Sequence, residues 1–301
     1  MNRVHELIGT EWARKQNLSG KGVGVAVLDT GVYPHPDFGR RLLAFKDMLS
    51  GKRTPYDDNS HGTHVMGVLG GSGEGSGGLY EGVAPGCSLI GIKILDSRGN
   101  GSVSSLLKGL RWLRDHKKEY GIRIVNISVG SVPRKETGEE SALIRGVEAA
   151  WADGLVVVVA AGNEGPGARS VTTPGISRKV ITVGSSDDHQ AVEVCGTSMV
   201  DYSGRGPTYR CICKPDVVAP GAAVVSCNAR NGKDTRLYGV KSGTSMATPV
   251  VSGALALLLE KEPDMTPKEV KLRLRESAVD LGLPRNQQGW GMIHIARLLK
   301  P

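Results

Sequence analysis

Residues 243–259 read GTSMATPVVSGALALLL, a short polar segment that runs directly into an apolar stretch. The apolar stretch predicts a buried helix, and Ser245 falls in its first turn. The first backbone N–H groups of a helix lack partners within it and form the positive end of the helix dipole. They can therefore stabilise the anion that forms when a serine hydroxyl attacks a carbonyl carbon. Serine alone is a poor nucleophile, so this interpretation requires a base and a residue that orients the base.

Both required residues occur upstream of the helix. His61 stands in NSHGTHVMG at residues 59–67, near the expected start of another helix. Asp29 follows an apolar, β-branched run at residues 23–28, which predicts a buried parallel strand. Open α/β sheets place their sites at such strand ends. The chain order Asp, His, Ser is one of the orders in which catalytic triads are assembled, so Asp29, His61 and Ser245 are candidate catalytic residues.

Four segments of the chain resemble the signature segments of the subtilisin-like serine proteases. They are VLDTGV at 27–32, NSHGTHVMG at 59–67, AAGNEG at 160–165 and SGTSMATP at 242–249, in the order of that family. The resemblance implies a serine endopeptidase in which Ser245 attacks a peptide carbonyl, His61 takes the proton and Asp29 fixes the imidazole tautomer. Water then releases the acyl-enzyme. It also implies that the side-chain amide of Asn163, in the loop after the apolar run 155–161, donates to the developing oxyanion.

Two further segments resemble the substrate cleft of the family. Residues 128–130 (SVG) resemble its Ser-Leu-Gly segment, and residues 99–101 (GNG) resemble a second binding edge. Glycines at an exposed edge let a substrate backbone approach closely and pair as an added strand. A plain glycine-rich turn is the alternative for either segment. The candidate substrate-binding residues are Ser128, Val129, Gly130, Gly99, Asn100, Gly101, Ala161 and Gly162.

The resemblance also predicts a specificity pocket for the residue before the scissile bond. Its walls are residues 128–130 and 161–163, and its base is the stretch around Thr172. Small, backbone-rich walls leave room for a large apolar side chain, so we expect Phe, Leu, Met or Tyr within a broad specificity. Glu164 at the rim would also attract a basic residue, although solvent screens an exposed charge.

Other interpretations of the same residues stay open at the level of sequence. The Asp-Thr-Gly at residues 29–31 is also the aspartic-protease signature, but that site needs two such segments or a homodimer, and the chain has one. His61 and His64 form a His-x-x-His pair, but no third metal ligand is nearby; we expect His64 to be a packed or hydrogen-bonded neighbour. A catalytically silent, peptide-binding scaffold of the same fold is the alternative to an enzyme.

The pattern of apolar runs predicts an α/β fold, a mostly parallel twisted sheet with helices on both faces in the three layers of the subtilisin-like proteins. Strands are expected near residues 23–28, 89–95, 122–128, 155–161 and 179–184, and helices near 62–71, 103–118, 139–152, 245–260 and 265–278. No linker or low-complexity stretch divides the 301 residues, of which 39% are hydrophobic. We therefore expect one peptidase domain over residues 1–301.

Charge and hydropathy argue for protein or peptide substrates rather than nucleic acid or membrane partners. The net charge of +8 invites a nucleic-acid interpretation, but basic residues form only short runs such as 117–118, and aromatic residues make up 4% of the chain. A solvated basic surface explains the charge. No apolar stretch reaches the length of a membrane span. The sequence leaves the oligomeric state open.

The predicted chemistry requires no cofactor, and a structural calcium ion is doubtful. Asp37 matches a residue that supplies a calcium ligand in many secreted subtilisins. The loop that would complete the site, residues 70–80 (GGSGEGSGGLY), lacks the family's asparagine-containing pattern. Ordering so many glycines is costly, so we expect the strong site to be missing and the loop to be mobile and prone to nicking. The alternative is a different site built by Glu74 and backbone carbonyls.

The amino-terminal segment and the cysteines favour a cytoplasmic protein. Residues 1–21 are polar and amphipathic, without a signal-peptide core or a preceding propeptide. A secreted protein represented by its mature fragment is the alternative. The five cysteines lack a disulfide framework, so we expect reduced thiols. A metal site made by Cys211, Cys213 and Cys195 is a further alternative.

Overall fold

The computed structural model describes residues 1–131, 142–194, 196–230 and 235–300. A seven-stranded sheet of order β2-β3-β1-β4-β5-β6-β9 runs through its centre, and every neighbouring pair of strands is parallel. The strands are β1 (Gly24–Asp29), β2 (Leu42–Asp47), β3 (Ser88–Lys93), β4 (Ile122–Ile127), β5 (Val156–Ala160), β6 (Ile181–Ser185) and β9 (Val217–Ala219). The chain forms β1 first and adds β2 and β3 on one side of it, and the later strands β4, β5, β6 and β9 then extend the sheet from the other side of β1. The ends of β1 and β4 therefore meet at the point where the strand order reverses, which is where open α/β sheets bind ligands.

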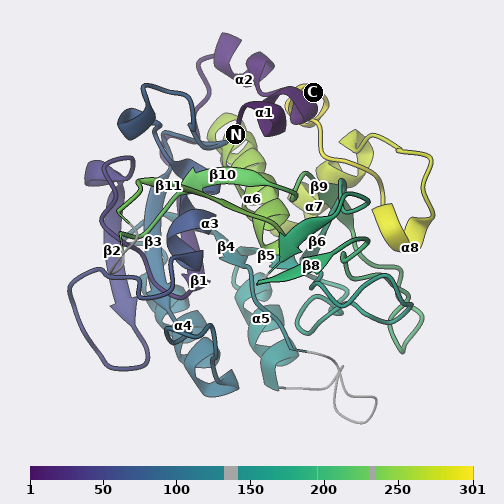
Figure 1. The fold of residues 1–301 in the computed structure, drawn as a ribbon, viewed down its shortest axis with the longest axis horizontal. Helices are drawn as coiled ribbons and strands as arrows, with labels where there is room; N and C mark the ends of the chain where they lie inside the picture. The colour runs from purple at the N-terminus through teal and green to yellow at the C-terminus, as the bar shows by residue number, and fades with distance from the viewer. Residues whose placement is uncertain (132–141, 195, 231–234, 301) are drawn as a thin grey trace.

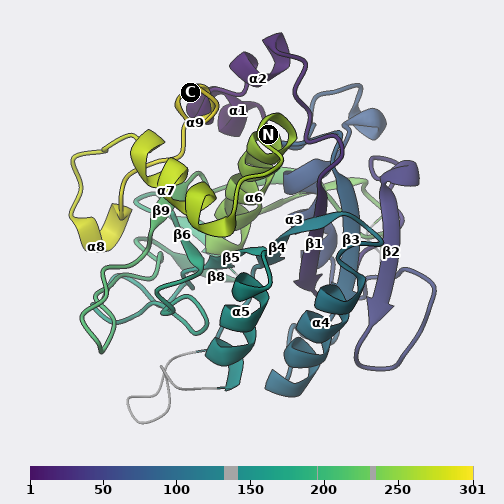
Figure 2. The same ribbon diagram turned by 180° about the vertical axis from the view of Figure 1, so that it is seen from behind.

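Helices cover both faces of the sheet, as predicted (Figure 1). Alternate residues of one strand enter different hydrophobic cores: Val25 packs with α3 (His61–Gly70) and α6 (Thr244–Lys261), and Ala26 with α4 (Val103–His116) and α5 (Ala142–Ala152). This follows from the two-residue period of a strand. Figure 2 shows α4 and α5 side by side on the second face. The result is a three-layer α/β fold.

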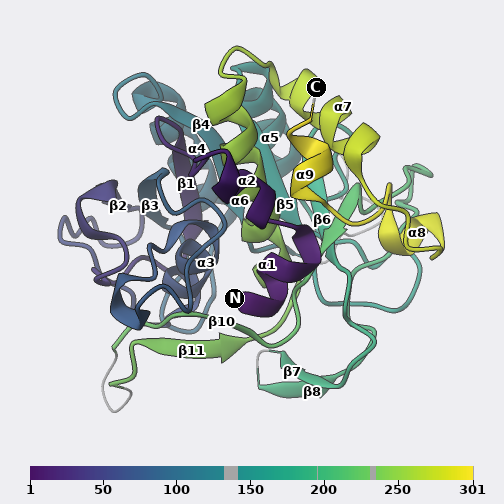
Figure 3. The same ribbon diagram turned by 90° about the horizontal axis from the view of Figure 1, so that it is seen from above.

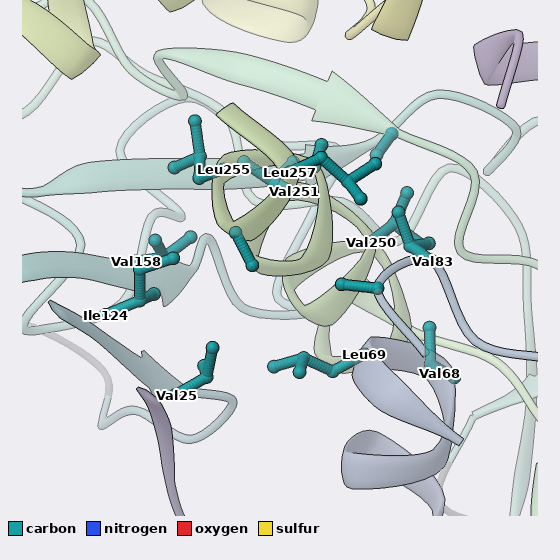
Figure 4. Close-up of a cluster of buried hydrophobic side chains, with 14 of the residues drawn as sticks. Val25, Val68, Leu69, Val83, Ile124, Val158, Val250, Val251, Leu255 and Leu257 are labelled. Carbon is teal, nitrogen blue, oxygen red and sulfur yellow. The ribbon is translucent and has the colours of Figure 1, made fainter. Parts of the chain in front are cut away.

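Helix α6 forms the centre of the larger core. From Thr244 to Leu259 every residue except Ser245 is buried, which is the pattern of a helix that packs on all sides. Val250, Val251, Leu255 and Leu257 of α6 gather with strand and α3 side chains in this core (Figure 4). The sheet and α3 thus hold α6 along its length, and its first turn reaches the carboxyl edge of the sheet.

The predicted elements correspond to β1, β3, β4, β5 and β6, and to α3, α4, α6 and α7 (Pro267–Ser277), with boundaries that differ by a few residues. The expected helix at 139–152 corresponds to α5, although its first residues lie outside the described part of the chain. Single-domain organisation over 1–301 stays a prediction.

Several elements were missed, because they are short or lie at edges of the sheet. They are β2, β9, the hairpins β7 (Val192–Val194) with β8 (Thr197–Met199) and β10 (Val224–Cys227) with β11 (Tyr238–Lys241), and the helices α1 (Asn2–Ile8), α2 (Glu11–Lys15), α8 (Arg285–Gln288) and α9 (Ile295–Leu298). Within the described residues, no helix combines the length and apolar character needed to cross a membrane.

Candidate active site

The sequence-predicted residues converge at the carboxyl edge of the sheet. Asp29 ends β1, Ser128 follows β4 directly and Asn163 lies in the loop after β5. These three strands are neighbours in the sheet. His61 is the first residue of α3, and Ser245 is the second residue of α6. Parallel strands end at the same edge, which is why segments more than a hundred residues apart supply one site.

Asp29 and His61 form a direct pair. His61 Nδ1 lies 2.7 Å from Asp29 Oδ1, and the Asp29 side chain is 1% exposed. Burial lowers the pKa of the His61 imidazole, but the charge of Asp29 and its hydrogen bond outweigh burial and raise that pKa above its ordinary value. The imidazole is thus held with Nδ1 towards the carboxylate, and Nε2 is left for a substrate-side partner.

A second buried carboxylate, Asp57, locks the segment that carries His61. Its oxygens accept hydrogen bonds from the hydroxyl of Thr30 at 2.9 Å, from the backbone N–H of Ser60 at 2.8 Å and from the hydroxyl of Thr63 at 2.6 Å. Thr30 in turn accepts from the backbone N–H of Gly62. Sequence reasoning missed Asp57. The available signal was an Asp shortly before Ser and Thr residues at a helix start, where carboxylates bind free N–H groups.

Ser245 and Ser128 are bonded to each other in both directions. Ser245 Oγ donates to the backbone carbonyl of Ser128 at 2.7 Å, and Ser128 Oγ donates to the backbone carbonyl of Ser245 at 3.0 Å. This reciprocal contact ties the first turn of α6 to the end of β4. The side chain predicted to be the nucleophile therefore lies against the predicted substrate-binding edge.

The amide of Asn163 is oriented by α6. Its Oδ1 accepts hydrogen bonds from the backbone N–H of Thr244 at 3.0 Å and from the Thr244 hydroxyl at 3.1 Å. Because the oxygen is occupied, the NH₂ end is the part of the amide left to donate into the cleft. A fixed donor beside the first turn of a helix suits a developing negative charge.

A cleft of about 800 Å³ joins these groups. His61, Ser245 and Asn163 line it together with Gly99 and residues 128–130. An adjoining hollow of about 290 Å³ shares Gly99, Val129 and Gly130 with the cleft and adds Asn100 and Gly101. The two predicted substrate edges thus border one continuous depression.

Two hairpins that the sequence did not reveal line a further part of the cleft. Val192, Glu193 and Gly196 line it from β7–β8, and Val240 and Lys241 line it from β11. Figure 3 shows both hairpins along the same side of the molecule. Their contribution depends on a tertiary approach, because neither segment carries a motif of its own.

The predicted specificity pocket is partly filled by Thr172. A Cβ built on Gly130 would collide with Thr172 Oγ1, and a Cβ built on Gly162 would collide with Thr172 Cγ2. Thr172 is 5% exposed, and its hydroxyl donates to the carbonyl of Ala161 at 3.3 Å. Ala161 and Gly162 do not line the cleft, in contrast to Gly130. The side chain of Thr172 therefore occupies the space between the two predicted walls.

His64 is a buried, hydrogen-bonded neighbour rather than part of the cleft. Its Nε2 donates to the carbonyl of Val224 at 3.0 Å. Burial, with the nearby charges of Lys241 and His61, lowers the pKa of His64 to about 3. The ring is therefore neutral near pH 7 and packs α3 against β10.

The carboxylate of Asp37, the predicted calcium ligand, is occupied by hydrogen-bond donors. Tyr238 donates its hydroxyl to the two oxygens at 2.9 and 3.0 Å, and the backbone N–H of Gly75 donates at 2.8 Å. A calcium ion would have to displace these donors, so the residues do not fit that ion. The same contacts anchor the glycine-rich loop, which contains the short helix η2 (Glu74–Ser76). Hydrogen bonds to Asp37 and within the loop oppose the entropy of ordering it, and the mobility of the loop stays a prediction.

His35 and Cys227 lie beside Asp37, and the ligand atoms of the three residues are within 4.8 Å of one another. The lone pair of His35 Nδ1 already accepts from the backbone N–H of Asp37 at 3.2 Å, and His35 Nε2 donates to the carbonyl of Leu237. The cluster is therefore satisfied as a hydrogen-bonded core and offers a metal little. Cys87, Cys211, Cys213 and Cys227 are free thiols, and Cys195 lies outside the described residues.

The comparisons with known proteins agree with this geometry. Residues 20–291 match the model of the subtilase family. The chain belongs to the subtilase family. It is 43% identical over 273 residues to the serine protease AprX of Bacillus subtilis, which covers 86% of this chain, and 34% identical over 282 residues to subtilisin Savinase of Lederbergia lenta, which covers 94%. Among solved structures, the S41 psychrophilic protease superposes with a TM-score of 0.77 at 30% identity, covering 92% of each chain.

These relatives differ in how much of their own length the subtilase chain spans. It spans 62% of AprX and 92% of Savinase. Serine proteases are thus similar to this chain over most of its length.

Proposed function

We propose that this subtilase is a serine endopeptidase that uses Ser245 as nucleophile, His61 as base, Asp29 as the residue that orients the base and Asn163 as oxyanion donor. The observation that carries the proposal is the 2.7 Å pair of buried Asp29 with His61, which lies in the same cleft as Ser245 and Asn163. A nucleophile, a base and an oxyanion donor therefore border one cleft, as the reaction requires.

The proposed reaction breaks the peptide bond by way of an acyl-enzyme ester on Ser245, which is then hydrolysed. The Ser245 hydroxyl first turns from the Ser128 carbonyl, to which it donates in the structure, towards His61 Nε2. Ser245 Oγ then attacks the peptide carbonyl carbon while its proton passes to His61 Nε2. The tetrahedral oxyanion accepts hydrogen bonds from Asn163 and from the backbone N–H of Ser245. His61 then gives its proton to the amine as the C–N bond breaks, which leaves an ester between the substrate acyl group and Ser245. His61 next takes a proton from water, which attacks the ester carbonyl, and returns that proton to Ser245 Oγ as the ester bond breaks.

The electrostatics of the pair favour the charged intermediate. The carboxylate of Asp29 stabilises the imidazolium that forms when His61 accepts the proton, which is the same effect that raises the His61 pKa. Loss of one oxyanion donor typically costs about 10²–10³ in turnover, a magnitude measured in another subtilase. Asn163→Ala should therefore lower kcat by that factor and change KM little.

Hydrolysis of a chromogenic peptide separates an endopeptidase from a silent peptide-binding scaffold. A serine-directed phosphonate should abolish the activity and add its mass to the peptide that contains Ser245. Ser245→Ala should take up no label. Peptide binding without hydrolysis or labelling would establish the scaffold instead. The position of His61, Ser245 and Asn163 around one cleft, with buried Asp29 bonded to His61, favours the enzyme.

We propose an apolar preference before the scissile bond that is narrower than the sequence suggested. The side chain of Thr172 lies between Gly130 and Gly162, so the pocket should accept Leu, Met or Ala better than Phe or Tyr. In a peptide series varied at that position, Thr172→Gly should raise kcat/KM for Phe relative to Ala by roughly tenfold, since a few methylene-sized contacts decide such ratios. An unchanged ratio would remove Thr172 from the pocket, and a profile dominated by Asp or Glu would refute an apolar pocket altogether.

Protein or peptide substrates are proposed as the partners, with no cofactor in the reaction. The location of the protein stays a proposal as well. The comparisons give no support to the cytoplasmic setting, and a secreted protein fits its similarity to the subtilisins. Fractionation of cells that express the gene from its own promoter decides between the two.

A further inference from the structure

Pro249 creates an unmet backbone acceptor directly beneath the proposed nucleophile. In an α-helix the carbonyl of residue i accepts from the N–H of residue i+4. The carbonyl of Ser245 should therefore accept from residue 249, but that residue is a proline inside α6 and has no N–H. The proline ring also crowds the carbonyl four residues earlier and turns it away from the helix axis.

The hydroxyl of Ser128 supplies the missing donor. Ser128 Oγ donates to the carbonyl of Ser245 at 3.0 Å, while accepting from Asn126 Nδ2 at 3.0 Å. Asn126 Oδ1 accepts from the hydroxyl of Ser252, about two turns after Ser245 in α6, at 2.8 Å. Asn126 and Ser252 are fully buried, and Ser128 is 3% exposed. The chain of donors therefore runs without a gap from the interior of α6, across β4, to the carbonyl that Pro249 leaves unpaired.

We infer that Ser128, oriented by Asn126 and Ser252, is a positioning residue that holds the first turn of α6 in the geometry needed for attack by Ser245. The role belongs to the hydroxyl of Ser128 and is separate from the backbone of residues 128–130 at the substrate edge. Pro249 and Ser128 act as a complementary pair: the proline removes a donor, and the serine replaces it. The inference rests on the proposed role of Ser245 as the nucleophile.

The test is a double-mutant cycle between these two residues. Ser128→Ala should lower kcat and the rate of phosphonate labelling by roughly 3- to 10-fold, the worth of one ordinary buried hydrogen bond, with a smaller change in KM. Pro249→Ala restores a backbone N–H that can donate to the Ser245 carbonyl. In that background the loss caused by Ser128→Ala should shrink to less than about twofold, because the carbonyl keeps a partner.

Ser226→Ala is the matched control. Ser226 is also a fully buried serine whose hydroxyl donates to a helix carbonyl, that of His64, at 3.0 Å. The residue four positions later is Val68, which has its own N–H. The effect of Ser226→Ala on kcat should therefore be the same with and without Pro249→Ala. Where Ser128→Ala fails to fold, Ser128→Cys keeps the volume and offers only a weak donor, and it enters the cycle instead.

The outcomes are separable from those for the proposed function. Equal losses from the Ser128 substitution in both backgrounds would overturn the pairing with Pro249, while phosphonate labelling of the unmodified protein would still support the nucleophile. If Pro249→Ala also reduced the loss caused by Ser226→Ala to the same extent, the effect would be one of general stability, and the inference would be overturned. An unmodified protein that is neither active nor labelled would instead contradict the proposed function itself.

Discussion

At the scale of single residues, the site depends on side chains that act as one unit. The proposed attack by Ser245 needs His61 to take its proton, so neither residue supports catalysis without the other. Ser245→Ala should lower kcat by roughly 10⁶, as for another subtilase, and adding His61→Ala should cost less than about tenfold more. Active-site titration and turnover of a chromogenic peptide measure both. Losses that multiply would show that the two residues do not share one mechanism.

The pH dependence belongs to the same scale. His61 must be neutral to act as a base, and the pKa of His61 is raised above its ordinary value of 6.5. Activity should therefore be present above that raised pKa and be lost as pH falls through it. Asp29→Asn removes the charge that raises the pKa, so the acidic limb of kcat/KM should move to lower pH while the maximum rate drops. An acidic limb that stays in place would mean that another group controls it.

At the scale of elements, α7 shows that local sequence can specify a helix start. Thr266 Oγ1 accepts from the backbone N–H of Glu269, and the Glu269 carboxylate accepts from the backbone N–H of Thr266, which is a capping box. Pro267 then occupies the first turn, where it costs no hydrogen bond. The helix therefore begins at Pro267, two residues after the predicted start at residue 265, directly behind this cap.

We expect Thr266→Ala to lower the free energy of unfolding by about 1 kcal/mol, the usual cost of an N-cap. Urea unfolding followed by circular dichroism measures it, in the Ser245→Ala background to prevent self-digestion. Thr54→Ala, which changes an exposed loop threonine, serves as the control and should have almost no effect. Equal stability of the two variants would contradict the assigned cap.

At the scale of the whole molecule, stability should not depend on calcium at Asp37. Its carboxylate joins the loop at Gly75 to Tyr238 of β11 by hydrogen bonds. The melting midpoint of the Ser245→Ala protein should therefore be the same with and without a chelator. Asp37→Ala should lower it equally in both conditions, because it removes donor–acceptor pairs rather than an ion. A midpoint that falls as calcium is withdrawn would show a stabilising ion and contradict this expectation.

Features set by neighbouring residues were predictable from the sequence, and features set by distant residues were not. The run that forms β5 is apolar throughout, that of β1 is apolar up to Asp29, and that of β4 is mostly apolar, so burial in a parallel sheet was readable from each run alone. β2 was missed because it lies at the edge of the sheet and is only partly buried, which blurs its pattern. The sequence predicted Thr172 at the base of an open pocket. In the structure its side chain lies between Gly130 and Gly162, a position that is set by packing and not by the local sequence.

The sequence alone determined the fold class and predicted that Asp29, His61, Asn163 and Ser245 come together, because apolar periodicity and short motifs act locally and parallel strands end at a common edge. The tertiary structure alone decided how those residues are held. Asp57 reaches Thr30 from 27 positions away, and Ser128 reaches Ser245 from 117 positions away. Such contacts depend on which side chains the packed sheet and helices bring within hydrogen-bond distance. No local pattern encodes that distance, because it is set by the packing of the whole core.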